Sequence, residues 1–452
     1  MNNNDLTEGS VLKSLLRFFF PILLGMLFQQ LYNTVDAIVV GRVVGHEALA
    51  AVGGSPAVII NLVIGVFTGL ASGATVIISQ FFGSRDDERL SRAAHTILAF
   101  CLLAGVAVTV LGSASALWSL RLVKTPEDIL DLSARYLRIY YVGAAPLLLF
   151  NVASGILRAV GDSRRPLLYL AVCCCVNIVL DLLFVAQLGM GVVGVAWATV
   201  FSQLVGAALI LLRFGRSAGP ERLELRRLRV EARSLRRILY IGVPAAIQGS
   251  MYSISNILIQ SAINDFGTTV VAAWTAIGKF DGIYWVTSQS FGIAICTFVG
   301  QCFGAGKYDR MKEGVRKWLA LDIGVSVCVS VTLLSLSRWG LLIFTSDAAV
   351  IAEARRLMWY FAPFYAVWCF IEILSNTLRG VGDAVAPTVV SLMGVCVLRV
   401  LWLLFVFPHW HTITGVSVSY PVTWSVTALV FIIYYVRGKW LSRAMGGARA
   451  AK

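Results

Sequence analysis

Ile156–Pro166 reads ILRAVGDSRRP, and Thr377–Pro387, which begins 221 residues later, reads TLRGVGDAVAP. The same offset places Gln80–Gly83 (QFFG) on Gln301–Gly304 (QCFG). Chance similarity between hydrophobic segments does not easily produce a shared LRxVGDxxxP motif at a register that holds without gaps from about residue 80 to 209. Self-similarity at a fixed offset therefore indicates that the chain consists of two homologous halves.

The composition is that of a membrane protein, with 58% hydrophobic and 14% charged residues and a mean hydropathy of +0.79. A soluble domain has about 45–50% apolar and about 25% charged residues. Charged side chains are absent from several stretches, each longer than the ~20 residues that a membrane-spanning helix needs: Ala48–Ser84, Ala93–Leu120, Leu182–Leu212, Ile238–Asn264 and Val400–Val436. These features exclude a soluble enzyme, a disordered chain and a secreted disulfide scaffold.

The apolar runs predict an all-α integral membrane protein with twelve spanning helices. We expect them near residues 15–38, 49–79, 93–118, 135–157, 166–187, 192–213, 237–263, 270–300, 316–338, 355–378, 387–408 and 413–437. The predicted domains are an N-terminal six-helix lobe, a basic cytoplasmic linker, a C-terminal six-helix lobe and a cytoplasmic tail, at residues 1–213, 214–236, 237–437 and 438–452. Because six is even, the two halves form a parallel repeat about an axis along the membrane normal.

The net charge of +14 is explained by the distribution of basic residues. Of 38 Lys and Arg residues, 28 fall on the side that holds both termini and the predicted linker, whereas 8 fall on the other side. Basic residues concentrate in cytoplasmic loops, so both termini are predicted to be cytoplasmic. The linker is expected to contact anionic lipid headgroups. Nucleic-acid binding is disfavoured because no aromatic platform or binding fold accompanies the basic segment.

Other short motifs do not indicate a leader, a metal site or a cofactor. Residues 1–10 are polar and acidic, so no removable signal peptide is expected. The nine cysteines form no CxxC pair, and neither a metal nor a cofactor is predicted. Gly304–Lys307 (GAGK) has neither the spacing of a phosphate-binding loop nor the Ser or Thr that follows its lysine. No ATPase module is recognised, so any transport is expected to be driven by an ion gradient or by a partner.

Two acidic residues lie within predicted spans of the N-terminal half. Gln29, Asn33 and Asp36 stand at i, i+4 and i+7, which places them on one face of the first helix. Asn177 and Asp181 are similarly spaced in the fifth span. Thr199, in the sixth span, is expected at the same depth in the outer half of this lobe.

Charges in the bilayer are expensive, which makes these acids functional candidates. Two carboxylates surrounded by amide and hydroxyl oxygens suit either a shared proton or a hard cation such as Na⁺. The alternative is that the polar groups only join helices, as is common in membrane bundles. The repeat argues against this alternative for the acids, because Ile259 and Trp402 occupy the positions equivalent to Asp36 and Asp181.

The C-terminal half carries different charges within its spans, namely Lys279, Asp281, Glu372 and Arg399. One interpretation is that Lys279 neutralises Asp281 and that Arg399 neutralises Glu372. The other is that Lys279 and Glu372 line a substrate cavity. The full set of cavity candidates consists of these two residues with Tyr32, Asn33, Asn151, Gln248, Tyr252, Ser255 and Asn256.

The chain resembles the multidrug and toxic compound extrusion (MATE) family over residues 10–437. The resemblance rests on the first span, the QFFG segment, the twin LRxVGD motifs and the repeat; in the first span the matching residues are Pro21, Gly25, Gln29, Tyr32, Asn33, Val35, Asp36 and Gly41. Asp36, Asp181, Asn177, Thr199 and Gln29 resemble the cation site of the DinF-like prokaryotic branch. The resemblance implies that Asp36 and Asp181 couple H⁺ or Na⁺ to transport.

The implied function is antiport that exports amphipathic or cationic drugs from a bacterium. The expected location is the inner membrane, and the expected partners are drug-like molecules and membrane lipids, with the protein acting as a monomer and not as an enzyme. The NorM-like branch carries an acid in its seventh helix, and here that helix has none before Asp265. Glu372 is then the acid left for a C-terminal cation site.

Two other functions are alternatives to the export of drugs. A lipid-linked oligosaccharide flippase of the same superfamily would want a strongly cationic cavity, and only Lys279 and Arg399 are available for one. An integral membrane enzyme would need a His and Asp cluster at a membrane face and would not need an internal repeat.

Overall fold

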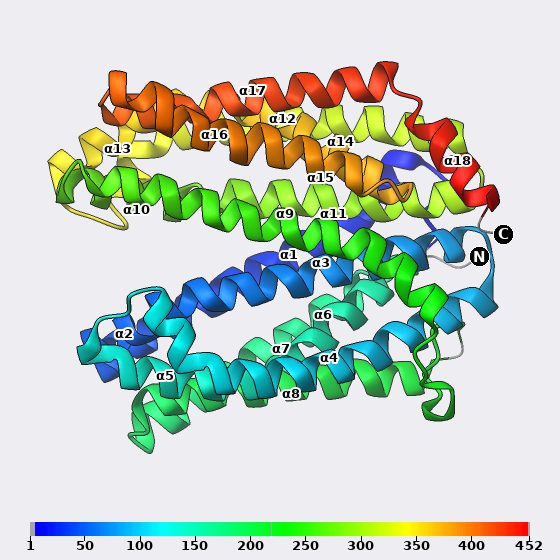
Figure 1. Ribbon diagram of the computed structural model, residues 1–452, viewed down its shortest axis with the longest axis horizontal. Coiled ribbons are helices and arrows are strands. Elements are labelled where there is room, and N and C mark those ends of the chain that lie inside the picture. The colour runs from blue at the N-terminus through cyan, green and yellow to red at the C-terminus, as the bar shows by residue number, and fades with distance from the viewer. Residues whose placement is uncertain (1–4, 218, 451–452) are drawn as a thin grey trace. The chain divides into compact units, whose positions relative to one another are not determined.

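The computed structural model describes residues 5–217 and 219–450, and the regular elements in this part of the chain are all helical (Figure 1). The first half contains α1 (Val11–Val39), α2 (His46–Gly53), α3 (Ser55–Gly83), α4 (Asp87–Leu122), α5 (Glu127–Val142), α6 (Ala144–Ala159), α7 (Arg164–Asp181) and α8 (Gly191–Gly215). The second half contains α9 (Ala232–Asn264), α10 (Thr268–Phe280), α11 (Gly282–Gly304), α12 (Tyr308–Leu341), α13 (Ala348–Phe361), α14 (Tyr365–Gly380), α15 (Val385–Ser391), α16 (Leu398–Leu401), α17 (Ile413–Arg437) and α18 (Trp440–Ala450).

Short π-helical and 3₁₀ segments connect or extend these helices. The π-helical segments are η1 (Val40–Val44), η2 (Leu182–Gln187), η5 (Leu392–Val397) and η6 (Trp402–Val406). The 3₁₀ segments are η3 (Leu225–Arg227), η4 (Ala362–Phe364) and η7 (Phe407–His409).

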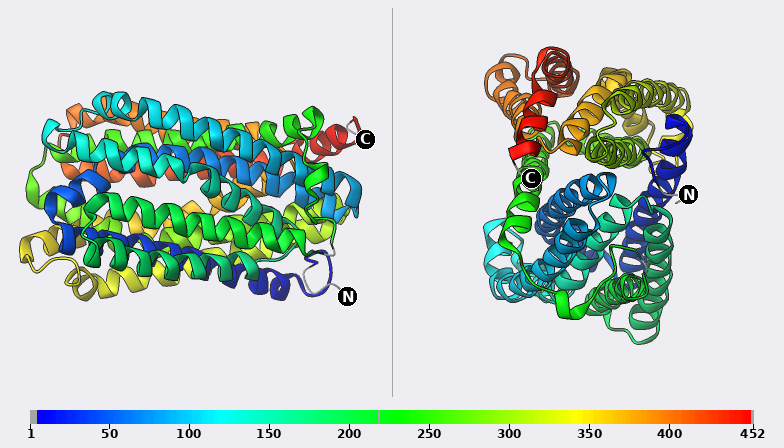
Figure 2. Two further views of the ribbon diagram at one scale, coloured as in Figure 1. Left: turned by 90° about the horizontal axis from the view of Figure 1, so that it is seen from below. Right: turned by 90° about the vertical axis from the view of Figure 1, so that its right-hand side faces the viewer.

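The chain divides into two compact units, each a bundle of helices that Figure 2 shows from two further directions. Unit 1 consists of Phe20–Ala246 with Asp5, and unit 2 consists of Leu6–Phe19 with residues 247–450. The division therefore passes through α1 just before Pro21 and through α9 just after Pro244, two prolines inside their helices. Each of these long helices thus contributes its first segment to one unit and its remainder to the other.

The two units repeat one packing scheme. In unit 1, α3 and α4 pack on α6 and on each other, and α6 packs on α8. In unit 2, α11 and α12 pack on α14 and on each other, and α14 packs on α17. The pairs correspond at the sequence offset of 221, so the internal repeat in the sequence is also a repeat in the fold.

The LRxVGD motif forms the same turn in both units. In the first copy, α6 ends just before Gly161, which takes φ +84°. The Gly161 N–H donates to the Arg158 carbonyl at 2.8 Å, and the Asp162 N–H donates to the Leu157 carbonyl at 2.9 Å. This is the hydrogen-bond pattern with which a left-handed glycine closes a helix. In the second copy Gly382 takes φ +95° with bonds of 2.8 and 3.0 Å to the corresponding carbonyls.

The aspartate of the motif begins the following helix. Asp162 Oδ1 accepts from the Arg165 N–H at 3.2 Å, and Asp383 Oδ1 accepts from the Ala386 N–H at 3.2 Å. These bonds satisfy backbone donors that a helix N-terminus leaves free. The motif is therefore a structural joint, which explains why it survives in both halves while the acids within the spans do not.

Ten of the described helices are long and apolar enough to span a membrane, or eleven if α5 and α6, which meet at a 48° bend, form one span. The predicted span at 237–263 coincides with α9, a helix of 33 residues that is absent from this set. Its arginines and its polar stripe from Gln248 to Asn256 reduce its hydropathy. Several other predicted spans consist of two helices in succession, such as α10 with α11 and α13 with α14.

The basic linker is fastened to α4 within unit 1. His95, which is buried, accepts the Glu224 N–H at Nε2 (3.0 Å), and its Nδ1 lies 2.7 Å from the Ser91 carbonyl. Thr96 Oγ1 accepts the Glu231 N–H at 3.3 Å. The linker thus has a defined path along the end of the bundle.

The GAGK segment between α11 and α12 binds the start of the chain. Lys307 Nζ donates to the Thr7 carbonyl at 3.0 Å, and Arg310 donates to the carbonyls of Leu6, Glu8 and Gly9. Leu6 N–H in turn donates to Gln301 Oε1 at 3.0 Å. The lysine is therefore occupied by backbone, in agreement with the sequence argument against a phosphate loop.

The twin turns give a prediction for stability. Replacing Gly161 or Gly382 by alanine forces a Cβ into the left-handed region, which costs about 1–2 kcal/mol per residue. We expect each variant to lower the free energy of unfolding of the detergent-solubilised protein by that amount, measured by thermal or denaturant unfolding. The control is Gly324→Ala in α12, where an added Cβ meets no atom within 4 Å. Equal stability of all three variants would contradict the assignment.

Candidate functional site

Asp36 and Asp181 are brought together by one amide. Asn177 lies one turn before Asp181 in α7, and its amide nitrogen, in the orientation that satisfies its neighbours, donates to Asp36 Oδ1 at 2.8 Å and to Asp181 Oδ2 at 3.1 Å. Asp36 is partly buried, whereas Asn177 and Asp181 are completely buried. The two carboxyls are themselves in side-chain contact. The sequence prediction that α1 and α7 place these three residues in one cluster therefore agrees with the geometry.

Two hydroxyl groups complete the cluster. Tyr32, one turn before Asp36, interacts with the Asp36 carboxyl through its hydroxyl and also donates to Thr199 Oγ1 at 3.5 Å. Thr199 lies on α8, is buried, and donates to the Val195 carbonyl at 3.0 Å. The site thus draws its polar groups from α1, α7 and α8.

Gln29 and Asn33 lie outside the cluster. Both are exposed on α1, and within the described part of the chain no hydrogen bond joins either residue to Asp36 or Asp181. Their helical spacing places them near the acids along α1, but the i, i+4 neighbour that reaches Asp36 is Tyr32. Tyr32, and not Gln29, is therefore the residue of α1 whose side chain contacts the Asp36 carboxyl.

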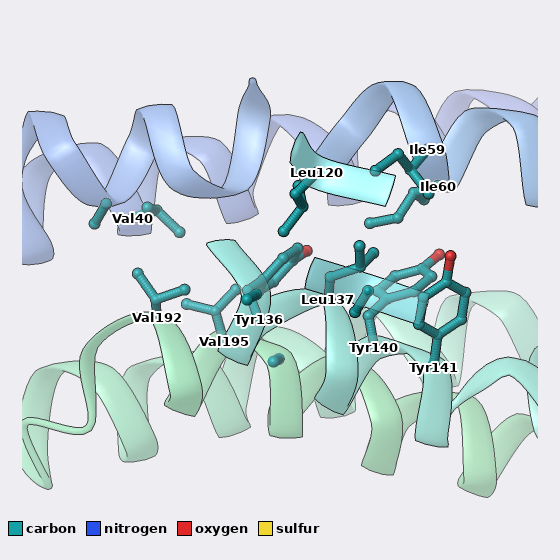
Figure 3. Packing of buried hydrophobic residues seen from close by; sticks show 14 of the residues in the cluster. Val40, Ile59, Ile60, Leu120, Tyr136, Leu137, Tyr140, Tyr141, Val192 and Val195 are labelled. Atoms are coloured by element: carbon teal, nitrogen blue, oxygen red, sulfur yellow. The ribbon is translucent and has the colours of Figure 1, made fainter. Parts of the chain in front are cut away.

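An apolar cluster closes the end of the site. It includes Val39 and Val40 after Asp36, Val185 after Asp181, and Val195 from α8. Tyr136 and Tyr140 of α5 belong to it and lie within electrostatic range of Asp36 (Figure 3). The hydropathy pattern does not single out these tyrosines, because α5 carries several charged residues. The buried side chains of the cluster lie next to the acids on this side.

Each of the two acids lies just before a π-helical segment, since η1 begins at Val40 and η2 at Leu182. The two segments contact each other. π-Helical turns appear mostly as single insertions in α-helices and are frequent at functional sites. Here they widen α1 and α7 directly beyond the carboxyls.

The charge balance of the cluster is unusual for a buried site. No basic side chain in the described residues forms an ion pair with Asp36 or Asp181, and Asp181 Oδ1 has no hydrogen-bond partner there. Two ionised carboxylates so close together and away from water would be strongly destabilising. The arrangement can therefore take up a positive charge, either a shared proton or a small hard cation bound by oxygen atoms.

Two of the cavity candidates of unit 2, Gln248 and Tyr252 of α9, form a hydrogen-bonded group with Arg379 of α14. Gln248 Nε2 donates to Tyr252 Oη at 3.0 Å, and the Arg379 guanidinium donates to Gln248 Oε1. Ser255 is buried with an unpartnered hydroxyl, and Asn256 is exposed. In unit 1, Asn151 donates to the carbonyl of Leu147, one turn earlier, at 2.9 Å.

The charge pairs proposed for the C-terminal half do not form among the described residues. Glu372 Oε1 accepts from Asn376 at 2.9 Å, while the Arg399 guanidinium lies 4.1 Å from the centre of the Tyr420 ring. The pairing of Glu372 with Arg399 is therefore wrong, because α14 supplies its own partner and Arg399 packs on an aromatic face, as arginine favours.

The pairing of Lys279 with Asp281 is also wrong. Asp281 Oδ2 accepts from Tyr365 Oη at 2.9 Å and from Trp285 Nε1 at 3.1 Å, whereas Lys279 is exposed. Residues two apart on a helix point to different sides, which separates the two charges.

A further buried acid, Asp322 in α12, was missed. It lies inside a predicted span and is completely buried, so the rule that singled out Asp36 would also have found it. The expectation that Glu372 is the acid left for a C-terminal cation site is therefore incomplete.

The comparisons with known proteins agree with the fold and the repeat. The MatE family model matches residues 21–183 and again 244–403. The probable multidrug resistance protein YoeA of Bacillus subtilis is 30% identical over 95% of this chain and 94% of its own length. A FAD transporter of Shewanella oneidensis is 22% identical over 93% of this chain and 94% of its own.

A solved structure shows the same fold. A MOP superfamily transporter from Pyrococcus furiosus superposes with a TM-score of 0.90 at 24% identity, and the match covers 98% of each chain. The twofold match of the family model falls on the two halves of the repeat, and the relatives align over nearly the whole length. The chain therefore belongs to the MATE family of membrane transporters.

Proposed function

We propose that this protein is a cation-coupled antiporter that exports amphipathic, cationic drugs across a bacterial inner membrane. The observation that carries the proposal is the pair of carboxyls, Asp36 and Asp181, which Asn177 joins and which no basic side chain among the described residues pairs with. The relatives named for multidrug resistance support drugs as the cargo. A relative named as a FAD transporter shows that membership of the family does not by itself define the cargo.

The coupling ion loads at the acid pair. When the site is open to the outside, a proton or Na⁺ neutralises the carboxyls, and the hydrogen bonds that link α1 to α7 and α8 rearrange. The loaded site then has less affinity for a cationic drug, and the drug leaves. Ion and drug each favour one of two states of the transporter, so their exchange is a population shift.

We propose that the coupling ion is a proton. In the orientation assigned from its neighbours, the Asn177 amide directs N–H groups, not its carbonyl oxygen, at the two carboxyls. A bound Na⁺ would prefer further oxygen ligands in this position. A carboxyl that receives one donated hydrogen bond can still hold a shared proton on its other oxygen.

A lipid-linked oligosaccharide flippase is not favoured by the charges in the spans. Such a cargo carries a pyrophosphate, and its recognition requires a cluster of basic side chains. Lys279 is exposed, and Arg399 packs on Tyr420. No other observation supports this cargo.

The carboxyls give a direct prediction for transport. In proteoliposomes with a ΔpH, Asp36→Asn and Asp181→Asn are each expected to abolish efflux of ethidium, because an amide cannot release and bind the coupling proton. The control is Asp347→Asn, since Asp347 only caps α13 through its bonds to Ala349 and Val350 and asparagine is an equally good cap. Wild-type rates in both acid variants would refute the coupling assignment.

The choice of ion has its own test. Ethidium efflux from wild-type proteoliposomes is measured with a proton gradient alone and with a Na⁺ gradient alone. We expect the proton gradient to drive efflux and the Na⁺ gradient to drive little. The reverse result would assign the site to Na⁺, and an absence of efflux with either gradient would refute ethidium antiport.

The distribution of basic residues gives a prediction for topology. We propose that both termini and the linker face the cytoplasm. Single cysteines introduced into the C-terminal tail, in a variant without native cysteines, should react with a membrane-impermeant maleimide only after the cells are permeabilised. Labelling of intact cells would contradict the proposed orientation.

A further inference from the structure

Unit 2 contains a completely buried carboxyl that the proposed mechanism does not use. Asp322 lies in the middle of α12, between Trp318 and Ser326, with no exposed surface. Neither of its carboxyl oxygens has a hydrogen-bond partner of good geometry among the described residues, although the Cys369 thiol and the Ser326 hydroxyl approach the carboxyl. A buried carboxyl is normally hydrogen-bonded, so this group requires an explanation.

Small polar groups from the neighbouring helices surround Asp322. Ser326 follows one turn later on α12, and its hydroxyl accepts from Cys369 Sγ of α14 at 3.0 Å. Tyr284 and Ser288 of α11 face the same region, and the Ser288 hydroxyl is also buried and unpartnered. Asp322, Ser326, Ser288 and Cys369 therefore form a group of buried polar side chains, the α12 cluster, between α11, α12 and α14.

Among the described residues, no positive charge neutralises the α12 cluster. The titratable groups that face Asp322 are Tyr284 from α11 and Cys369 and Glu372 from α14, and none of them is basic. Arg379, the nearest base identified on α14, acts on Glu372 and donates to Gln248. An isolated carboxylate in such an environment takes up a proton instead of remaining charged.

The repeat shows that the fold does not require this acid. The position equivalent to Asp322 in unit 1 is Cys101 of α4, at the offset of 221, and Cys101 is also completely buried. Both helices pack in the same way on α6 and α14, respectively. A small apolar side chain therefore satisfies the packing at this position, and the carboxyl is an addition specific to unit 2.

The α12 cluster lies next to an aromatic contact between α12 and the first segment of α1. Trp318, one turn before Asp322, lies 5.5 Å from the ring of Phe19 and 4.7 Å from Phe291. Its indole N–H donates to the Phe291 carbonyl at 3.1 Å. Phe19 belongs to the first segment of α1, so this contact joins α12 to α1 within unit 2.

We propose that Asp322 is a second proton-carrying site of the transport cycle, located in unit 2 and independent of the Asp36–Asp181 pair. This inference rests on the proposed antiport. The Asp322 carboxyl binds the proton within the α12 cluster. The proton is released when unit 2 changes conformation and admits water. Ser326 and Ser288 then donate hydrogen bonds to the resulting carboxylate.

The first experiment counts protons. Ethidium efflux and proton uptake are measured together in proteoliposomes with a ΔpH for the wild type, Asp322→Asn, Asp322→Glu and the control Asp347→Asn. We expect Asp322→Asn to move one proton fewer per ethidium, whereas Asp322→Glu and the control keep the wild-type ratio. An unchanged ratio in Asp322→Asn overturns the proposal.

The second measurement applies even if Asp322→Asn does not transport. Infrared difference spectra of the reconstituted protein between acidic and alkaline buffer report the carbonyl band of protonated carboxyls. The proposal predicts a pH-dependent band that disappears in Asp322→Asn but remains in Asp36→Asn. The proposal is overturned if the wild type and Asp322→Asn show the same carbonyl bands, or if no carbonyl band changes with pH. Because this readout needs no substrate, it stands apart from a failure of ethidium antiport itself.

Discussion

The low dielectric of the bundle interior is the constraint on which the chemistry of this protein depends. A carboxylate without a base or water nearby is unstable there, so the negative charge of Asp36 and Asp181 has to be stabilised by hydrogen-bond donors or by a bound cation. Asn177 supplies two N–H bonds, and Tyr32 and Thr199 add hydroxyls from two further helices. In the proposed mechanism, a transported cation neutralises the remaining negative charge, and this neutralisation alters the bonds that hold α1, α7 and α8 together.

The duplicated fold separates structure from function within one chain. The twin Gly161 and Gly382 turns, and the packing of α6 and α14 on their neighbours, are retained in both units. The acids are not, since Asp36, Asp181 and Asp322 have apolar or weakly polar counterparts at the equivalent positions. One copy thus acts as an internal control for the other, and it shows that none of the three acids is needed for the helices to pack.

Much of the architecture could be predicted because it follows from long apolar runs and a gapless repeat. The cluster of Asp36, Asn177 and Asp181 could also be predicted, since helical spacing and depth bring them to one level. The partners in unit 2 could not be predicted. Arg399 packs on the Tyr420 ring and Asp281 accepts from Tyr365, and both contacts depend on how separate helices pack together. Asp322 was within reach of the same reasoning, because it is a lone acid in an apolar span.

Proton release on drug binding tests the central claim most directly. Ethidium is added to the detergent-solubilised protein in weakly buffered solution, and the released protons are counted for the wild type and for a variant with Asp36→Asn and Asp181→Asn combined. If the pair carries the coupling proton, the wild type releases protons when ethidium binds. The combined variant then releases fewer protons, because those bound by Asp36 and Asp181 are missing. Equal release from both proteins, with ethidium bound in each, would show that the coupling ion is carried elsewhere.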